Sequence, residues 1–290
     1  MSSPVAETSP RQNLDGIAFE AFGVSVGVTS DDPRVLAGLR GLAPIPSKPC
    51  DLASARYCIG ATFTEERRLD VRFTVRDGEV LKERDLSAGI AADADSELAI
   101  ASIDAHVQSC IALNAPEHIF IRAGVVAYNG RAIVLPGGAV SGKSTLVREL
   151  VSAGAALYSE DYAPFDEHGL IHPYFRPSIP GQALAETNGY GTSSDPHSAE
   201  EMHPLPVSAI VLTTYWPGAT WQPQRLSDGE AILALVSHAE AGSERPKETF
   251  NGITRAVASH PVVLQSDRGE AKAVAPLLLA DVERALAEAA

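Results

Sequence analysis

The sequence contains few of the residues on which several classes of protein depend. Its 290 residues include only 3 cysteines, 2 tryptophans and 2 methionines, and aromatic residues make up 6%. The cysteines, Cys50, Cys58 and Cys110, are odd in number and lie far outside Cys-x-x-Cys spacing. Such a set indicates neither a disulfide framework nor a zinc cluster. We therefore expect three reduced, buried thiols.

Positive charge and long apolar runs are also scarce. The chain has 23 Lys and Arg against 37 Asp and Glu, a net charge of −14. Binding to nucleic acid or to anionic membranes requires clustered positive charge, so neither is an expected partner. No apolar stretch reaches the roughly 20 residues of a membrane helix, and residues 1–12 do not resemble a secretory signal. The sequence predicts a cytoplasmic protein that holds any anionic ligand at a local site.

The first part of the chain is predicted to be rich in β-structure and to end in a helix. Apolar and polar residues alternate from Leu69 to Val75, before the turn signal Asp77-Gly78. Apolar residues then recur at helical spacing from Ile100 to Ile111, ahead of Asn114-Ala115-Pro116, which would stop a helix. We divide the chain into a flexible tail (1–13), a β-rich region ending in a helix (14–116) and a second region (117–290).

The second region is predicted to alternate strands with helices. Asn129-Gly130 is a strong hairpin signal. The stretch Thr187–His203, within a part rich in Pro and Gly, predicts a mobile loop. The expected strands cover 119–126, 132–135, 155–159, 207–212 and 262–264, and the expected helices cover 145–153, 229–238 and 273–289. The fold class is mixed α/β.

A glycine-rich loop between a predicted strand and a predicted helix has the clearest chemistry. Gly137-Gly138-Ala139-Val140-Ser141-Gly142-Lys143-Ser144 matches the P-loop pattern G-x-x-x-x-G-K-[ST]. Backbone N–H groups at a helix N-terminus surround a phosphate there, and the lysine adds a charge. We expect Lys143 to reach the phosphates of ATP and Ser144 to coordinate Mg²⁺, with Thr145 completing the nucleotide-binding segment.

An acidic pair, Glu160-Asp161, follows the next predicted strand. Ligands in open α/β sheets bind at the carboxyl ends of strands, so these carboxylates can approach the same metal and the γ-phosphate. A helix cap or a turn is the alternative role for the pair.

The loop and the acidic pair resemble the HPr kinase/phosphorylase catalytic domain, and more closely the shorter HPr-kinase-like proteins, which share a fold with phosphoenolpyruvate carboxykinase. Besides the loop, the similar spacing includes Gly124, Asn129-Gly130, Gly154 and Glu160-Asp161, within about forty residues. The segments Tyr162–Asp166 and Pro173–Pro177 also look like the HPr-kinase-like proteins.

The resemblance implies a P-loop fold of the phosphoenolpyruvate carboxykinase type and a serine kinase activity. The γ-phosphate of ATP would pass to a hydroxyl group. The favoured acceptor is a serine of a peptide, a protein or a small molecule. One acidic residue would deprotonate that hydroxyl and the other would bind Mg²⁺. Asp161 is our first choice for the base and Glu160 for the metal ligand. Carboxykinase activity itself is not expected, because the chain is short and shows no separate substrate domain.

The chain also departs from the family pattern. Arg122 stands where HPr kinases usually have a histidine, so it is either a phosphate-stabilising cation or a surface arginine. Ala139-Val140 replaces Ser-Gly, and a β-branched valine limits close approach to phosphate. The glycine-rich segment and the separate amino-terminal domain of true HPr kinases have no counterpart, so HPr is not an expected partner. The alternative function is therefore a nucleotide-binding regulatory protein without transfer activity.

Several further residues are weaker candidates. Arg176, between an aromatic pair and Pro177, could stabilise the transferred phosphate or be a solvated loop arginine. Arg245 and Lys247 lie in a segment predicted as a mobile loop, where they could bind phosphate or be solvated. Four histidines lack a compact metal-ligand spacing and are expected to be solvated loop residues: His168, His172, His197 and His203. Trp216 and Trp221 are expected to pack or to form a turn, with substrate stacking as the alternative. The expected partners are a nucleotide and a hydroxyl-bearing acceptor, and formation of a homo-oligomer is left open.

Overall fold

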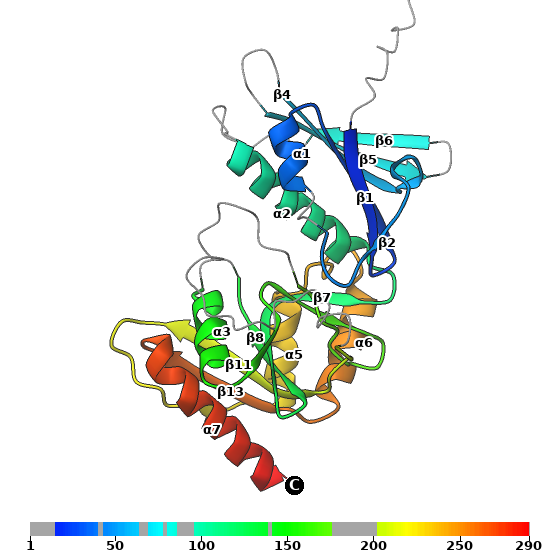
Figure 1. Ribbon diagram of the computed structural model, residues 1–290. Helices are drawn as coiled ribbons and strands as arrows, with labels where there is room; N and C mark the ends of the chain where they lie inside the picture. Colours follow the sequence, from blue (N-terminus) through cyan, green and yellow to red (C-terminus); the bar gives the residue numbers. More distant parts are fainter. Residues whose placement is uncertain are drawn as a thin grey trace, which may run out of the picture.

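The computed structural model contains two mixed β-sheets, each covered by helices (Figure 1). It describes residues 15–39, 43–63, 69–77, 80–85, 96–138, 141–175 and 202–289. Six α-helices occur in these ranges. The expected mixed α/β class is therefore confirmed at this level. None of the helices in the same ranges is long and apolar enough to cross a membrane.

The first sheet has six strands and is covered on one face by two helices. Its order is β3 (Lys48–Pro49), β1 (Asp15–Ala21), β2 (Val24–Ser30), β4 (Tyr57–Phe63), β5 (Leu69–Asp77) and β6 (Val80–Asp85). Only β2 and β4 pair in parallel. Helices α1 (Pro33–Leu39) and α2 (Ser96–Asn114) pack on this sheet (Figure 1), and a 3-10 turn covers Leu52–Ser54. The alternation predicted along β5 is confirmed, since Leu69 and Val71 are buried.

The second sheet leads into the glycine-rich loop, which begins at Gly137. Its order is β10 (Tyr162–Phe165), β7 (Ile119–Tyr128), β8 (Arg131–Pro136), β11 (Val207–Tyr215), β13 (Val262–Arg268) and β12 (Gln224–Arg225), with β9 (Ala156–Ser159) also pairing with β7. The central strands β8, β11 and β13 are parallel. Because they are covered on both faces, β11 begins with five consecutive buried residues instead of an alternating pattern.

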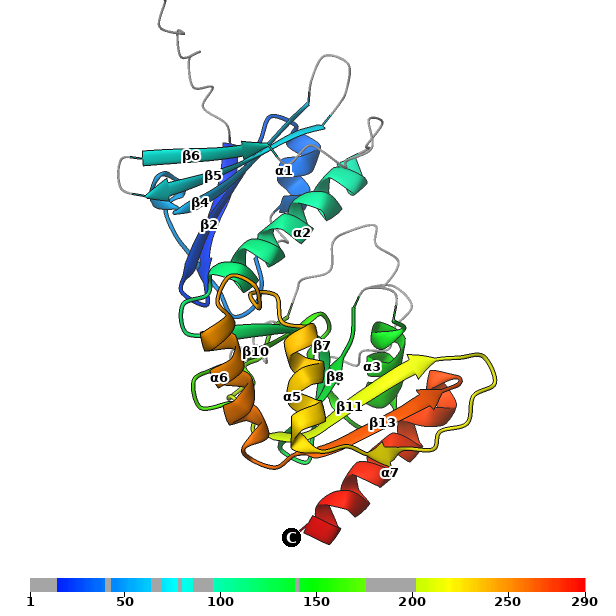
Figure 2. The ribbon, with the colours of Figure 1, turned by 180° about the vertical axis from the view of Figure 1, so that it is seen from behind.

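Helices cover both faces of the second sheet (Figure 2). Helices α3 (Lys143–Ser152) and α7 (Ala271–Ala289) pack on one face, in a core that includes Ile133, Val211 and Leu264. Helices α5 (Asp228–Ser237) and α6 (Pro246–Val257) pack on the other. The sheet therefore lies between two helical layers, with the loop after β8 leading into α3.

Aromatic packing joins the two sheets. Phe22, in the turn between β1 and β2, lies with its ring centroid 5.2 Å from that of Phe120 and 5.7 Å from that of Tyr174. Both partners belong to the second region, 117–290, yet they are buried in the same core as α2. Arg245 adds a polar link, because it donates hydrogen bonds to the carbonyls of Ala115 and His118.

The prediction of a mobile loop around Arg245 and Lys247 was wrong. Arg245 is the N-cap residue of α6, and Pro246 is its first residue. The buried face of α6 includes Thr249 and Gly252, which are not apolar residues of the kind that mark a helical pattern. Most of the loop predicted at 187–203, through residue 201, lies outside the described residues.

Several element boundaries also differ from those predicted; strand β11, for example, continues to Tyr215, three residues beyond the predicted end at 212. Helix α3 begins at Lys143, two residues before the predicted start, and strand β13 continues to Arg268, well beyond the predicted end at residue 264. In β13, buried residues alternate with Gln265 and Asp267, so the strand pattern there is polar on one face.

Candidate functional site

The loop after β8 places the N-terminus of α3 at the carboxyl ends of the parallel strands. Gly142 precedes the helix with φ 75°, a left-handed conformation that glycine adopts without strain. No side chain caps the helix, and no acidic residue lies in its first turn. Its first N–H groups and the positive end of its dipole can therefore act on an anion.

Gly124 on β7 allows α3 to lie close to the sheet. A Cβ atom at this position would lie 2.5 Å from Val147 Cγ2 and 3.1 Å from Lys143 Cγ. The aliphatic part of Lys143 therefore passes directly over the glycine. Its side chain is 10% exposed, and its Nζ atom lies 3.8 Å from Asp161 Oδ1.

Lys143 and Asp161 line a common cavity of about 200 Å³ with Gly137 and Gly138. The wall is completed by Arg122, Tyr162 and two residues of α2, Ala105 and Gln108. The predicted loop, lysine and one carboxylate are thus brought together, and the first half of the chain contributes to their surroundings. The N–H group of Gly137 donates a hydrogen bond to the carbonyl of Arg122, so it is not available to bind a ligand.

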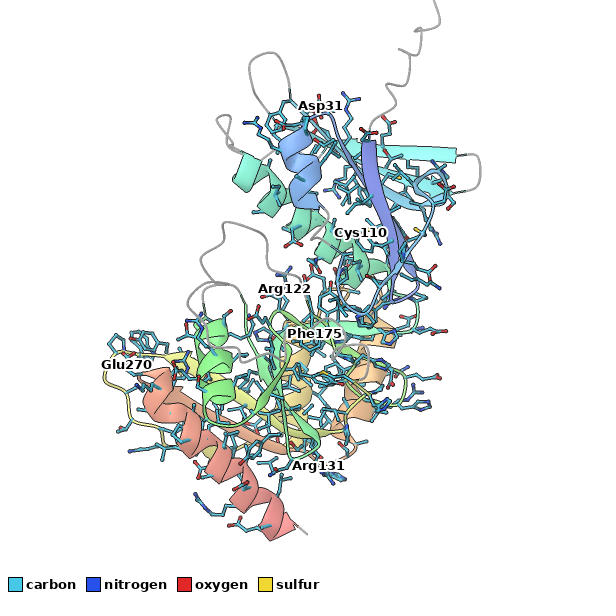
Figure 3. All side chains as sticks on the ribbon, in the orientation of Figure 1. Asp31, Cys110, Arg122, Arg131, Phe175 and Glu270 are labelled. Atoms are coloured by element: carbon cyan, nitrogen blue, oxygen red, sulfur yellow. The ribbon has the colours of Figure 1, made fainter. Side chains whose placement is uncertain are left out.

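Arg122 belongs to this cavity and is held by Glu240. Its Nε and Nη2 atoms lie 2.7 Å and 2.9 Å from the two carboxylate oxygens. The hydrogen bond to Glu240 raises the pKa of Arg122 above its ordinary value, and the guanidinium also lies 5.3 Å from the centre of the Tyr162 ring. Figure 3 places Arg122 between α2 and the second sheet. The guanidinium faces the loop cavity, but a carboxylate already offsets its charge.

Glu160 and Asp161 have different surroundings. Asp161 lines the cavity of Lys143, whereas Glu160 lines an adjoining space of about 30 Å³, together with Asp161, Tyr174 and Phe175. Ser144 is partly buried at the start of α3, and Thr145 is exposed. Three further predicted site residues, Ala139, Val140 and Arg176, lie outside the described residues.

Arg268 is a site residue that the sequence prediction missed. It ends β13 and is only 2% exposed. Its Nη2 atom donates a 2.9 Å hydrogen bond to the carbonyl of Gly142, its Nη1 atom donates to Gly269, and the guanidinium lies 5.4 Å from the centre of the Tyr215 ring. Burial lowers its pKa from the usual arginine value. Arg268 thus fixes Gly142, the residue before α3, and only a full-length β13 would have pointed to this arginine.

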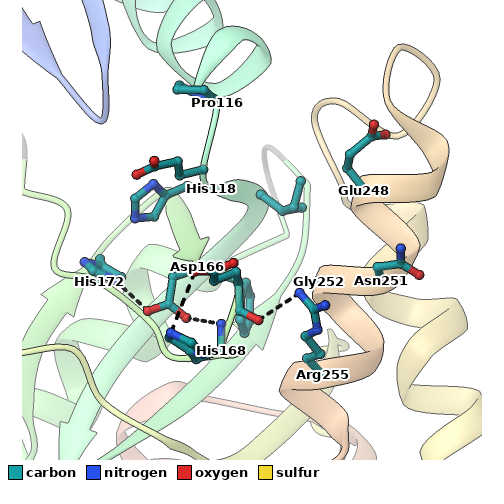
Figure 4. Close-up of a pocket in the computed structure, with 13 residues that line it drawn as sticks. Pro116, His118, Asp166, His168, His172, Glu248, Asn251, Gly252 and Arg255 are labelled. Carbon is teal, nitrogen blue, oxygen red and sulfur yellow. Dashed lines mark hydrogen bonds and ion pairs between the residues drawn. The ribbon is translucent and has the colours of Figure 1, made fainter.

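A separate cavity of about 510 Å³ lies between α6 and the segment after β10 (Figure 4). His172 Nε2 lies 3.0 Å from Asp166 Oδ2, and Asp166 Oδ1 accepts hydrogen bonds from two backbone N–H groups. Burial, followed by the nearby His172, lowers the pKa of His118 to about 4. Arg255 donates to the carbonyl of Glu167. Asp166, His172 and Arg255 have hydrogen-bond partners, whereas both ring nitrogens of His118 are buried without one among the described residues. His168 is exposed, as expected of a solvated loop histidine, but His172 is only partly exposed and is bound to Asp166.

The remaining candidates have packing roles or are solvated. Trp221 donates from Nε1 to Asp281, 2.7 Å away on α7, while Trp216 is 60% exposed. The carbonyl of His203 accepts a hydrogen bond from Tyr158, and His197 lies outside the described residues. Within the described ranges, no group of three or more His, Cys, Asp and Glu side chains could hold a metal ion.

No protein-family model and no curated protein sequence matches this chain. The loop, Lys143 and Asp161 are therefore the features of the chain that indicate a function.

Proposed function

We propose that the protein is an ATP-dependent phosphotransferase that moves the γ-phosphate to a hydroxyl, in the manner of HPr-kinase-like serine kinases. The observation that supports this most is the cavity that joins two glycines of the P-loop to Lys143 and Asp161. A lysine of low exposure at a helix N-terminus is electrostatically disfavoured unless negative charge compensates it. Asp161 offers one such charge at 3.8 Å, and bound phosphates would supply more.

The described residues fit the groups that such a reaction requires. Mg-ATP would supply the phosphoryl group to be transferred. Lys143 and the N–H groups of α3 would bind its phosphates. The hydroxyl of Ser144 and the carboxylate of Glu160 are hard oxygen ligands of the kind that Mg²⁺ prefers, and they are its proposed ligands.

Asp161 is the proposed general base. It faces the P-loop cavity, where an acceptor hydroxyl would have to lie for in-line attack on the γ-phosphate. Arg122 would partly offset the charge on the phosphoryl group, because Glu240 holds it in place and reduces its net charge. A serine of a peptide, a protein or a small molecule is the proposed acceptor, and a phosphoenolpyruvate carboxykinase-type fold is the proposed fold.

The second candidate is a nucleotide-binding regulatory protein without transfer activity. The pairing of Arg122 with Glu240 favours it, because a guanidinium with a bidentate carboxylate partner is less able to stabilise added negative charge. Both candidates require Mg-ATP to bind. Only the kinase forms a product on an acceptor, and only the kinase loses that activity when Asp161 is replaced.

The two candidates are separated by measuring ADP formation from Mg-ATP with a panel of serine peptides and small hydroxyl compounds. For a kinase, Asp161→Asn should lower kcat by about 100-fold or more, because general-base catalysis contributes that much. Nucleotide affinity should change far less. Glu160→Gln is the matched control and should instead raise the Mg²⁺ concentration needed for turnover. Equal turnover by wild type and Asp161→Asn would contradict the proposed base.

A further inference from the structure

A second cavity, of about 650 Å³, also borders the P-loop. It shares Gly137 and Gly138 with the cavity of Lys143, so these two glycines form a common wall. From there it extends along the carboxyl ends of β11, which is parallel to β8 and next to it, and of β13, which is parallel to β11. Ligands of open α/β sheets bind at this edge. The phosphate chemistry proposed above leaves this cavity unused.

Four of the polar side chains that line this cavity come from one face of the sheet. Thr214 pairs with Asp267 in the parallel ladder, and Gln265 pairs with Gln224 in the antiparallel one. Paired residues project from the same face, as do alternate residues along one strand, so these four side chains project together. Val263, on the same face of β13, packs in the core of α5 and α6. The cavity therefore lies on the α5 side of the sheet.

The lining is polar but has little charge. Threonine and glutamine predominate: Thr213, Thr214, Thr220, Gln222, Gln224 and Gln265. Asp267 is the one carboxylate among the described residues that line the cavity, and those residues include no lysine or arginine. Ala234 and His238 close one side from the carboxyl end of α5, where the helix dipole is negative. Phosphate is therefore disfavoured here, whereas a neutral ligand with many hydrogen-bonding groups is favoured.

We propose that this cavity holds the nucleoside part of a nucleoside triphosphate, and this proposal rests on the phosphate-binding role of the P-loop. The ribose hydroxyls donate hydrogen bonds to Asp267. The amides of Gln224 and Gln265 bind the edge of the base, since an amide offers both donors and an acceptor. The phosphates pass along Gly137 and Gly138 to the cavity of Lys143.

Asp267 is well suited to a test because its substitution should not affect folding. It is exposed, and neither a salt bridge nor a side-chain hydrogen bond ties it to another described residue. Binding of ATP and of inorganic tripolyphosphate, each with Mg²⁺, is measured by calorimetry for wild type, Asp267→Asn and Lys143→Ala. Tripolyphosphate contacts the P-loop alone, so it reports on the phosphate site without the nucleoside.

The expected result is a change in selectivity. Asp267→Asn should raise the Kd of ATP about tenfold, since a hydrogen bond to a charged group is lost, and should leave the Kd of tripolyphosphate unchanged. A dideoxy analogue of ATP, which has no ribose hydroxyls, should bind wild type and Asp267→Asn equally. Lys143→Ala should weaken all three ligands.

Two results would overturn the proposal, and they are distinguishable. If Asp267→Asn leaves the ratio of the two Kd values at its wild-type level while Lys143→Ala weakens both ligands, the nucleoside lies elsewhere and the proposed function stands. If wild type binds neither ATP nor tripolyphosphate, the proposed function and this inference fail together.

Discussion

Replacing Gly124 with alanine should move α3 and Lys143 together. The added methyl group would lie 2.5 Å from Val147 Cγ2, closer than two carbon atoms can approach, and 3.1 Å from Lys143 Cγ. Val147 is fully buried and β-branched, so its side chain has little freedom to rotate within the helix. Overpacking of this kind costs about 1–3 kcal/mol in unfolding free energy. Displacement of Lys143 should also weaken binding of Mg-ATP.

A compensating substitution tests the physical cause. Val147→Ala alone should cost about 2 kcal/mol, because two buried methyl groups are lost and a small cavity remains. In the double variant the new methyl group occupies part of that cavity. The loss of unfolding free energy in the double variant should therefore be smaller than the sum of the two single losses by about 1 kcal/mol or more. Urea unfolding of the four proteins measures this coupling. Additive losses would refute the contact between Gly124 and α3 as the reason for a glycine there.

Three further substitutions test other parts of the structure. Gly138→Ala should leave the unfolding temperature unchanged, because no described atom lies within 4 Å of the added methyl group, but calorimetry should show weaker binding of Mg-ATP. Arg245→Met should lower the unfolding free energy by about 2 kcal/mol, since two backbone carbonyls lose a charged donor, and unchanged nucleotide affinity would exclude a phosphate role. Folding lowers the pKa of His118 from 6.5 to about 4. The free energy of unfolding should therefore fall as the pH drops from 6.5 to about 4, because the unfolded chain then binds more protons than the folded one. Urea unfolding at about pH 7 and about pH 4.5 measures this effect. After allowance for partial solvent screening, wild type should lose about 1–2 kcal/mol more unfolding free energy between these pH values than His118→Leu does. Equal losses in the two proteins would contradict a buried, neutral histidine.

Local patterns predicted the elements around the P-loop well. Strand β7, the turn at Asn129-Gly130, strand β8 and the next helix were all expected, because each has a strong local signal. The first sheet was predicted only in outline. Strands β1 and β2 form a local hairpin, but its turn at Phe22-Gly23 is not one of the strong two-residue turn signals. Strand β4 pairs with β2 across the intervening helix α1, and the pattern of one sequence does not reveal such a pairing. Helix α6 was missed because its buried face includes Thr249 and Gly252.

The site was predicted where residues are close in sequence and missed where the fold brings distant strands together. The loop and Asp161 could be named from the sequence, since a strand and a helix of known spacing separate them. Arg268 and Glu240 could not. Their partners, Gly142 and Arg122, lie more than a hundred residues earlier in the chain, and only the order of the strands brings each pair into contact. The contribution of α2 to the cavity likewise depends on the packing of one half of the chain on the other.

Thermal unfolding with and without millimolar Mg-ATP shows whether the P-loop and Lys143 bind Mg-ATP. A ligand present at about 100 times its Kd stabilises the folded state by about 2.7 kcal/mol. The unfolding temperature of wild type should therefore rise by several degrees, roughly 2–4 °C per kcal/mol for a chain of this size. Lys143→Ala should abolish the rise, while Lys247→Ala, which removes an exposed lysine of α6, should retain it. No rise in wild type, or an equal rise in Lys143→Ala, would contradict the account.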